Sequence, residues 1–320
     1  MLIHQYGSPE VFEWEEIPDP QIGDHELLVK AYGSSVNPVD CAIRQGELKS
    51  FIRLKLPAVL GVDVSGIVEK VGKNVTQFAV GDRVYAFLGL NRNGGYAEFV
   101  AIPESYVAAI PSNLNIAQAG VVPCVGLTAY QAFTDYAPLK QGMKVLINGA
   151  GGGVGTFAIQ IAKAMGCEVT AVCSESKVEL AKRLGADVVI NYKKENILDS
   201  DIEFDVILNC VRGSKIGKWS NLLKKGGKQI LIAANPLQMP LIKLSNLISS
   251  RKSLLLFVKA DGKSLQGLSE LIAGRKVKPI ISKTFALEAL TRAHQLSEME
   301  NIAGKIAISM EDNQSIKNER

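Results

Sequence analysis

The chain has 320 residues, a formal net charge of +4, 47% hydrophobic residues and 21% charged residues. This length allows two domains with hydrophobic cores, and the composition is that of ordinary globular proteins. The lysines and arginines are scattered and do not alternate with aromatic residues, so the charge gives no support for nucleic-acid binding. No apolar stretch reaches membrane-spanning length. We therefore expect no nucleic-acid partner and no membrane span.

The cysteines indicate a reducing environment. Cys41, Cys124, Cys167, Cys173 and Cys210 are odd in number and form no Cys-x-x-Cys pair. The N-terminal residues do not have the pattern of a secretory signal. Scattered thiols of this kind are typical of reduced intracellular proteins, so we predict a cytoplasmic location.

The first 120 residues are predicted to be rich in β-structure. Short apolar or alternating runs at Leu27–Val29, Val64–Val71 and Tyr96–Val100 indicate strands. Proline, glycine and asparagine residues separate these runs and favour turns.

The most informative stretch runs from Lys144 to Gly155. An apolar strand pattern at Val145–Ile147 is followed by five glycines and then by a helical pattern, with apolar residues three or four positions apart up to Met165. Such a strand, glycine turn and helix can present backbone N–H groups to a pyrophosphate, although a purely structural turn has the same appearance. The glycine spacing is G-x-x-G-x-x-G. The predicted nucleotide-binding residues are Gly149, Ala150, Gly151, Gly152, Gly153, Val154 and Gly155.

From about residue 120 the pattern alternates between strand and helix, which indicates a parallel sheet and an α/β fold class. A further apolar strand at Ser253–Val258 either closes this sheet or extends it across a dimer. The predicted strands are Val145–Asn148, Val169–Cys173, Val188–Ile190, Asp205–Leu208, Gln229–Ile232 and later Ile306–Ile308, and the predicted helices are Lys177–Leu184, Lys215–Leu223, Leu265–Ile272 and Leu287–Leu296.

Seven motifs in order along the chain carry a family resemblance. They are Ser35-Val36-Asn37-Pro38-Val39-Asp40, Gly61-Val62-Asp63-Val64-Ser65-Gly66, Gly81-Asp82-Arg83-Val84, Gly94-Gly95-Tyr96-Ala97-Glu98-Phe99, Gly126-Leu127-Thr128-Ala129, the glycine turn and Gly304-Lys305-Ile306. With them the sequence resembles the zinc-independent quinone oxidoreductase branch (zeta-crystallin-like) of the medium-chain dehydrogenase/reductase superfamily. It is most similar to members such as the chloroplast-envelope quinone oxidoreductase homologues and the enone reductases.

The resemblance implies a division into domains and an assembly. It implies a GroES-like β-rich substrate domain over residues 1–120 and a Rossmann NADP-binding domain with a doubly wound parallel sheet over residues 121–258. Residues 259–320 would then return to the substrate domain and end in a polar tail. A homodimer is common among similar proteins and is expected here.

The resemblance also predicts that the chain binds no metal. Zinc-dependent members hold catalytic zinc with a cysteine, a histidine and a second cysteine, whereas the matching positions here are Asn37–Asp40 and Gly61–Asp63. Only Cys124 remains near the third position, and packing explains this thiol better than a ligand role does. Catalytic zinc needs three protein ligands, so we predict none.

The predicted cofactor is NADP(H). No acidic residue ends the second strand of the nucleotide-binding domain, where NAD-preferring sites place one. Ser174, Lys177 and Tyr192 align with residues that hold the 2′-phosphate in similar proteins. The alternatives are a helix N-cap for Ser174 and a solvated cation for Lys177. Further cofactor-flanking residues implied by the resemblance, with core packing as the alternative for Phe257, are Ala234, Phe257 and Val258.

Without zinc, hydride transfer must depend on positioning and on hydrogen bonds to the acceptor oxygen. Asn37 could contact that oxygen or the nicotinamide ribose, or could be a turn residue before Pro38. Thr128 lies beside the nicotinamide in similar proteins. Asp40 and Asp63 are more often structural than acidic catalysts.

The predicted activity is therefore the NADPH-dependent reduction of a small-molecule quinone or α,β-unsaturated carbonyl, such as an enone or alkenal. The alternatives are a zinc-free alcohol dehydrogenase and a nucleotide-binding structural or regulatory protein with little catalysis.

Overall fold

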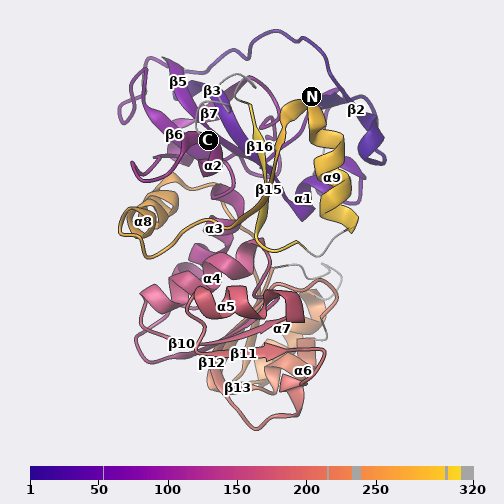
Figure 1. The fold of residues 1–320 in the computed structure, drawn as a ribbon, viewed down its shortest axis with the longest axis vertical. Helices are drawn as coiled ribbons and strands as arrows, with labels where there is room; N and C mark the ends of the chain where they lie inside the picture. The colour runs from indigo at the N-terminus through magenta and orange to yellow at the C-terminus, as the bar shows by residue number, and fades with distance from the viewer. Residues whose placement is uncertain (53, 215, 233–238, 300–301, 311–320) are drawn as a thin grey trace. The chain divides into compact units, whose positions relative to one another are not determined.

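The computed structural model describes residues 1–320 except 53, 215, 233–238, 300–301 and 311–320. The chain forms two compact units, which are described separately (Figure 1). Unit 1 comprises Met1–Cys124, Lys259–Ala273 and Ile281–Arg320, and unit 2 comprises Val125–Val258 and Gly274–Ile280. The predicted α/β fold class is confirmed.

Unit 1 is built on a seven-stranded sheet with the order β15-β16-β3-β5-β6-β8, in which β7 also pairs with β3. The last strand that the structure describes, β16, lies antiparallel to β3, so this late segment completes a sheet that the N-terminal segment began. A small second sheet has the order β2-β1-β4. The strands of unit 1 are β1 (Leu2–Ile3), β2 (Phe12–Glu13), β3 (Glu26–Val36), β4 (Ala58–Val59), β5 (Asp63–Val71), β6 (Arg83–Phe87), β7 (Phe99–Pro103), β8 (Val107–Ala109), β15 (Ile281–Ala286) and β16 (Lys305–Ser309).

Alternating side chains of β3, β5 and β6 form the core of this unit. Leu27 and Val29 on β3, Val64 on β5 and Val84 on β6 are each fully buried in one cluster. Burying one such side chain contributes about 1.5–3 kcal/mol to the hydrophobic driving force. The helices of unit 1 are α1 (Pro38–Arg44), α2 (Ile116–Ala119), α8 (Gly262–Ala273) and α9 (Leu290–Met299).

Unit 2 contains a six-stranded sheet with the order β11-β10-β9-β12-β13-β14, in which every pair is parallel. Strands β9 and β12 are neighbours although two strands separate them in sequence, so the order reverses between them. Ligands of such sheets bind at the carboxyl ends of the strands beside this reversal. The strands are β9 (Lys144–Asn148), β10 (Glu168–Cys173), β11 (Val188–Asn191), β12 (Phe204–Asn209), β13 (Leu223–Leu231) and β14 (Lys252–Leu255).

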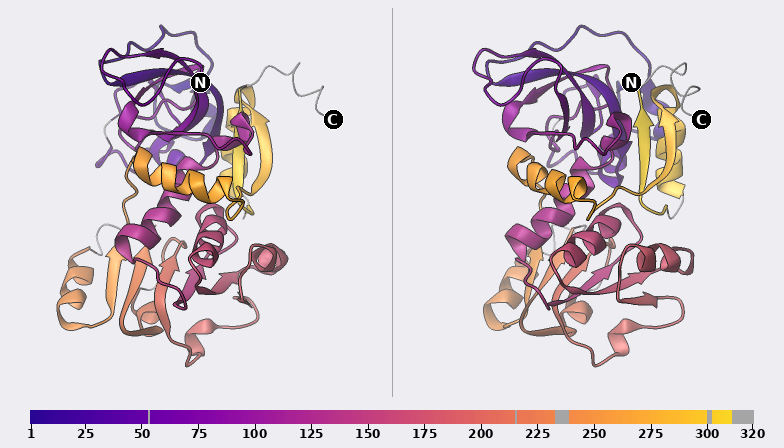
Figure 2. Two further views of the ribbon diagram at one scale, coloured as in Figure 1. Left: turned by 90° about the vertical axis from the view of Figure 1, so that its left-hand side faces the viewer. Right: turned by 60° about the vertical axis from the view of Figure 1, so that its left-hand side comes forward.

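Helices flank this parallel sheet (Figure 2). Helix α4 packs on β9 and β10, and α5 packs on β10 and β11, whereas α6 and α7 pack on β13 and β14. The helices are α3 (Pro123–Gln131), α4 (Gly153–Ala164), α5 (Val178–Arg183), α6 (Ile216–Ser220) and α7 (Met239–Ile248). In the described part of the chain, no helix is long and apolar enough to cross a membrane.

Some element predictions were wrong in detail. The strand predicted at Tyr96–Val100 begins only at Phe99, because Tyr96 is turned into the interior and is fully buried. The helix predicted over Lys215–Leu223 ends at Ser220, and Leu223 instead starts β13 by pairing with Phe204. Tertiary pairing here overrides the local helical pattern. Lys215 lies outside the described residues.

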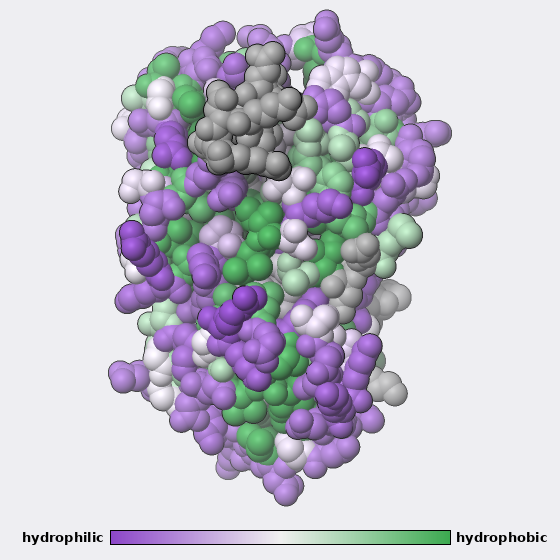
Figure 3. All heavy atoms as spheres, in the orientation of Figure 1, coloured by the Kyte–Doolittle hydropathy of each residue, from purple (hydrophilic) through white to green (hydrophobic). Residues whose placement is uncertain are grey.

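One face of the molecule is shown in Figure 3. Hydrophilic residues (purple) predominate on it, and hydrophobic residues (green) form smaller areas between them.

Candidate functional site

In unit 2, the glycine turn between β9 and α4 has the geometry of a phosphate-binding turn. Gly149 has a φ of +81°, a left-handed conformation that favours glycine. A Cβ at Gly155 would lie only 2.4 Å from the carbonyl oxygen of Gly149, so the first turn of α4 can approach the loop only without a side chain. The N–H groups of Gly149 and Ala150 both donate to the Val172 carbonyl, at 3.1 and 3.0 Å. Those two groups hold the turn to β10.

The N-terminus of α4 provides the groups that remain for an anion. Its N-cap is Gly152, which has no side chain to cap the helix, and the first turn contains no acidic residue. The N–H groups of the first helical residues, Gly153, Val154 and Gly155, have no partner within their own helix. Together with the helix dipole they fit the pyrophosphate of a dinucleotide.

The side chain of Lys177 lies directly over this turn. A Cβ at Gly151 would come within 2.4 Å of Cδ of Lys177, and Lys177 is only 5% exposed. Burial lowers the pKa of its ammonium group. Lys177 is therefore not a solvated cation. Ser174 is also buried, and its hydroxyl makes no capping bond but lies 3.3 Å from Oγ of Ser176.

Tyr192 lies next to Ser174 along the edge of the sheet, because its N–H donates to the carbonyl of Cys173 at 3.2 Å. Its side chain is 52% exposed. Glu175, which follows Ser174 in the chain, forms an ion pair with the Lys194 ammonium at 2.9 Å and accepts a hydrogen bond from the amide of Asn191. Its carboxylate is therefore held in an ion pair.

The other predicted residues of unit 2 occupy different settings. Thr128 is buried within α3. Phe257 is 56% exposed, which excludes the core-packing alternative, and its N–H donates to the Tyr136 hydroxyl at 3.2 Å. Val258 is half-buried. Ala234 lies outside the described residues.

Two asparagines at the strand-order reversal were missed in the sequence. Asn148 ends β9 and Asn209 ends β12, and the Asn148 amide donates to Oδ1 of Asn209 at 3.0 Å. Nδ2 of Asn209 is buried and has no hydrogen-bond partner among the described residues. A buried donor of this kind can serve a bound ligand. The sequence feature that could have indicated these two residues is the asparagine that ends each apolar strand.

In unit 1, Asn37 is the centre of a buried polar cluster at the start of α1. Its amide nitrogen donates to Oδ2 of Asp40 and to Oδ2 of Asp63, both at 2.9 Å. Its backbone N–H donates to Asp40 at 2.8 Å, and its Oδ1 accepts a hydrogen bond from the ammonium group of Lys305. Lys305 also donates to the carbonyl of Val36 at 2.9 Å. The structure therefore brings Asn37, Asp40 and Asp63 together, and it adds Lys305.

The two carboxyl groups of this cluster differ in their partners. Asp63 accepts from the Ser35 hydroxyl at 2.6 Å and from the Cys124 N–H at 2.6 Å, in addition to Asn37. Asp40 accepts both of its hydrogen bonds on Oδ2, and its buried Oδ1 has no partner among the described residues. Burial raises the pKa of both groups, that of Asp40 to about 7, with the Asp63 charge adding to the rise for Asp40.

A chain of hydrogen bonds between buried groups, from Arg44 through His294 and Tyr96 to Ser35, adjoins this cluster. Arg44 donates to Nδ1 of His294 at 3.2 Å, and because arginine cannot accept, the imidazole proton must reside on Nε2. Nε2 therefore donates to the Tyr96 hydroxyl at 3.2 Å, and that hydroxyl donates to the carbonyl of Ser35 at 3.1 Å. Burial and the Arg44 charge lower the pKa of His294 to about 3, so it is neutral.

These unit 1 residues were largely missed by sequence reasoning. Lys305 and Tyr96 belong to two of the seven family motifs, but the sequence analysis predicted no role for either residue. Arg44 and His294 gave no signal, because only the fold brings α1 against α9.

Comparisons with known proteins identify both parts of the chain. Residues 23–112 match the alcohol dehydrogenase GroES-like domain family, and residues 153–274 match the family described as zinc-binding dehydrogenase. The predicted GroES-like domain and the Rossmann-type parallel sheet are thereby confirmed.

The described residues do not fit catalytic zinc, despite that family description. Catalytic zinc needs three protein ligands, and among the described residues Cys124 belongs to no group of three histidine, cysteine or acidic side chains that could hold an ion. Both oxygens of Asp63 already accept hydrogen bonds. Asn37 lies in the segment that matches the first ligand, and its Oδ1 accepts a hydrogen bond from the ammonium group of Lys305, so a cation is already present.

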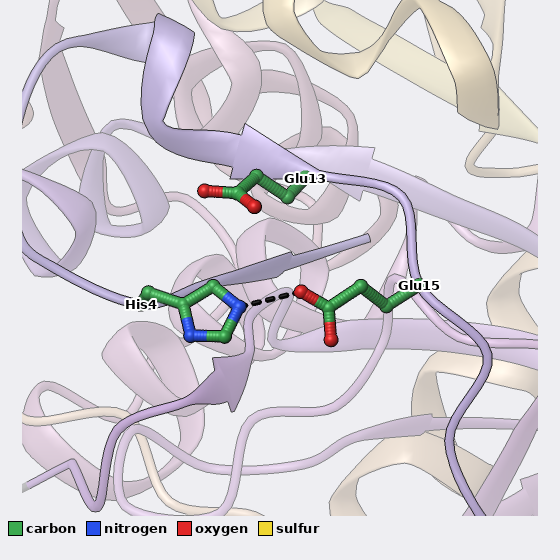
Figure 4. Close-up of side chains that lie close together, drawn as sticks. All are labelled: His4, Glu13 and Glu15. Atoms are coloured by element: carbon green, nitrogen blue, oxygen red, sulfur yellow. Dashed lines mark hydrogen bonds and ion pairs between the residues drawn. The ribbon is translucent and has the colours of Figure 1, made fainter.

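One other group of metal-ligand residues occurs among the described residues. His4, Glu13 and Glu15 bring their ligand atoms within 4.8 Å of one another beside β1 and β2 (Figure 4). All three are exposed, and Nε2 of His4 forms a hydrogen bond with Glu15 at 2.5 Å. Exposed groups of this kind are common without an ion, so we assign no metal to them.

The most informative relatives match almost the whole chain. The chloroplast envelope quinone oxidoreductase homolog of Arabidopsis thaliana is 33% identical over 94% of this chain and 95% of its own length. The chloroplastic NADPH-dependent alkenal/one oxidoreductase of the same plant is 32% identical over 95% of this chain and 77% of its own. The solved quinone oxidoreductase of Coxiella burnetii is 30% identical with a TM-score of 0.87, covering 97% of this chain and 98% of that one. The chain therefore belongs to the medium-chain dehydrogenase/reductase superfamily of oxidoreductases.

Proposed function

We propose that the chain is an NADPH-dependent reductase that transfers hydride to quinones or to α,β-unsaturated carbonyl compounds without zinc. The observation that carries the proposal is the uncapped, glycine-lined N-terminus of α4 with the buried Lys177 side chain over its turn. The names of the two plant relatives, a quinone oxidoreductase homolog and an alkenal/one oxidoreductase, support the class of acceptor.

The preference for NADPH over NADH follows from the charges at the end of β10. A 2′-phosphate is favoured by a nearby cation and by hydroxyl groups, and repelled by a carboxylate. Lys177 provides the cation, and Ser174 and Tyr192 provide the hydroxyls. Glu175 opposes the phosphate only weakly, because its charge is offset by Lys194.

The reduced nicotinamide of the bound cofactor supplies the hydride. The chain must then orient the acceptor and stabilise the negative charge that develops on its oxygen. Both N–H bonds of the Asn37 amide are committed to Asp40 and Asp63, so Asn37 offers a ligand only the second lone pair of Oδ1. We expect it to accept from a ribose hydroxyl, and the resemblance implies a position beside the nicotinamide for Thr128.

The positive charge that zinc supplies in other members of the superfamily comes here from Lys305. Its ammonium group has three N–H bonds, and two of them are used by Val36 and Asn37. The charge stabilises the two neighbouring carboxyl groups and adds a positive potential at the loop that precedes α1. The final proton comes from water in this proposal.

The test follows the absorbance of NADPH with a panel of a benzoquinone, a large o-quinone, an alkenal and an enone. We expect rapid oxidation with at least one member and much slower oxidation of NADH. Equal rates with NADH would contradict the cofactor assignment. Metal chelation before the assay should leave the rate unchanged.

Two outcomes would favour the alternatives. Flat traces across the panel, with NADPH binding measured by fluorescence, would favour a nucleotide-binding protein with little catalysis. Reduction of NADP⁺ by alcohols, without quinone or enone turnover, would favour an alcohol dehydrogenase.

We also propose that two copies of the chain form a homodimer through β14 and α7. Strand β14 is an edge strand of the six-stranded sheet, and its free side can pair with a second copy. Helix α7 beside it exposes a row of apolar side chains, with exposures from 61% to 87%, at Leu241, Leu244, Leu247 and Ile248. Apolar residues in a row beside the outer edge of a sheet are typical of a symmetric interface.

Light scattering after gel filtration tests this assembly. The double variant Leu244→Lys with Leu247→Lys should be monomeric, whereas Val188→Lys, on the opposite edge strand, should leave the mass at twice that of one chain. A wild-type monomer would contradict the dimer.

We also propose a cytoplasmic location, although both plant relatives are named for the chloroplast.

A further inference from the structure

The charges around Asp40 do not balance when every group has its ordinary protonation state. Asp40 is completely buried on α1 and faces Asp63 on β5 and Lys305 on β16. Two carboxylates and one ammonium group leave a net charge of −1 inside the unit. An uncompensated buried charge is costly, and binding a proton is the usual remedy.

The remaining titratable groups near Asp40 do not supply the missing positive charge. Tyr96, Cys41 and Cys124 each interact electrostatically with Asp40, and burial raises the pKa of all three, so they are neutral. On α9, His294 is neutral as well. The positive charge of Arg44 is paired with Glu298 on α9.

The hydrogen bonds decide which carboxyl group carries the proton. Asp63 accepts three donors spread over both oxygens, an arrangement that favours the ionised form. Asp40 accepts both of its bonds from Asn37 on Oδ2, its buried Oδ1 has no hydrogen-bond partner of good geometry among the described residues, and the neutral Tyr96 hydroxyl also interacts with this carboxyl group. A proton on Oδ1 removes the charge from the oxygen that receives no donor.

We propose that Asp40 carries a proton, as a neutral carboxylic acid, at mildly acidic pH and acts as a positioning residue for Asn37. With Asp40 protonated, Asp63 and Lys305 form a balanced pair on either side of the Asn37 amide. The amide nitrogen is then directed to the carboxyl groups and Oδ1 to Lys305. Ionisation of Asp40 adds a second negative charge that competes with Asn37 for the single ammonium group, and the orientation of the amide is weakened.

This inference deepens the proposed reductase function, because Asn37 is the residue through which Asp40 would affect turnover. Activity should fall as pH rises through the pKa of Asp40, which is about 7. Asp40→Asn carries a neutral side chain of the same shape at every pH. The ratio of kcat/KM at pH 8.5 to that at pH 6 should therefore be about tenfold higher in Asp40→Asn than in wild type. An unchanged ratio would overturn the link to turnover.

The protonation state itself can be measured without any turnover. Infrared difference spectra of wild type, recorded between pH 5 and pH 9, should contain the carbonyl stretch of a protonated carboxylic acid that disappears near pH 7. Asp40→Asn should lack this band. A wild-type spectrum without it at pH 6 would overturn the proposal, whatever the activity assays give.

Thermal unfolding gives a second readout. The folded-state pKa of Asp40 lies above its value of 3.8 in the unfolded chain, so wild type loses stability as pH rises from about 4 to about 7 and is unaffected above that. The gain in melting temperature of Asp40→Asn over wild type should therefore widen between pH 5 and pH 8. A gap of constant size would contradict the raised proton affinity.

Asp187→Asn is the matched control. Asp187 is paired with Lys163 at 2.8 Å in unit 2, and its pKa is lowered. A lowered pKa contributes stability that is lost only as pH falls below the ordinary range, so the gap between this variant and wild type should not change between pH 5 and pH 8. Activity of Asp187→Asn should follow the wild-type pH profile. If both variants shift the profile equally, the effect is not specific to Asp40.

Discussion

The two units prepare their polar sites in opposite ways. In unit 2 the glycine turn presents backbone N–H groups, and its geometry depends on the absence of side chains at positions such as Gly151 and Gly155. In unit 1 the site is built mainly from side chains, and buried charges on Asp63 and Lys305 hold the Asn37 amide. The first site is local in sequence, while the second unites residues more than 260 positions apart.

This contrast separates two kinds of vulnerability. The glycine turn is disrupted by steric overlap, and the single methyl group of an alanine is enough to cause it. The cluster of buried charges is destabilised when one charged group is removed, because the opposite charges that remain are no longer compensated. The following variants test the contrast, starting with the largest expected effect.

Lys305→Met should cause the largest loss of stability. It leaves the carboxyl groups of Asp40 and Asp63 without their cation, and breaking a buried charge pair costs about 3–5 kcal/mol. Urea unfolding at pH 8 measures the loss, which should be smaller at pH 5, where both carboxyl groups bind protons more readily. Lys283→Met, on the neighbouring strand β15 and exposed, should change stability by less than about 1 kcal/mol. Equal losses would mean that unit 1 does not depend on the buried charge.

Gly155→Ala should cost about 1–3 kcal/mol and abolish NADPH binding. Its Cβ would overlap the carbonyl oxygen of Gly149 at 2.4 Å. Gly152→Ala is the control for stability, because its Cβ would meet the same oxygen at an ordinary 3.5 Å. Calorimetric unfolding and NADPH titration distinguish the two variants, and a fully stable Gly155→Ala would contradict the steric account.

Lys177→Met should weaken NADPH binding about tenfold to a hundredfold and leave NADH binding nearly unchanged. The loss of a charge-assisted hydrogen bond to the phosphate corresponds to about 1.5–3 kcal/mol, and methionine retains the apolar stem over Gly151. Lys193→Met, on the same edge but exposed, serves as control. Fluorescence titration with both cofactors gives the answer, and equal losses for NADH and NADPH would refute the assignment.

Tyr192→Phe should have the smallest effect, a few-fold weaker affinity for NADPH. The hydroxyl is exposed, and a single hydrogen bond contributes about 0.5–1.5 kcal/mol. Unchanged affinity would remove Tyr192 from the site while leaving the assignments of Ser174 and Lys177 intact.

The same contrast explains how much the sequence could reveal. The glycine turn was predictable because strand, turn and helix follow one another within a dozen residues and each has a local pattern. The family resemblance supplied the two folds, and it predicts no zinc because Asn37–Asp40 and Gly61–Asp63 stand at the matching positions. Neither source pointed to the link between Asn37 and Lys305, because that contact arises only when β16 pairs with β3. The end of the helix before β13 was also missed, because strand pairing set it.

The return of the C-terminal segment to unit 1 has a consequence for synthesis. Asp40 and Asp63 leave the ribosome early, but their cation at position 305 follows only after all the strands of unit 2 have been made. At typical elongation rates this delay lasts some tens of seconds. During that interval the two carboxyl groups cannot be buried together with the ammonium group that compensates their charge. Unit 2 can therefore complete its fold while unit 1 is still open, although unit 1 begins the chain.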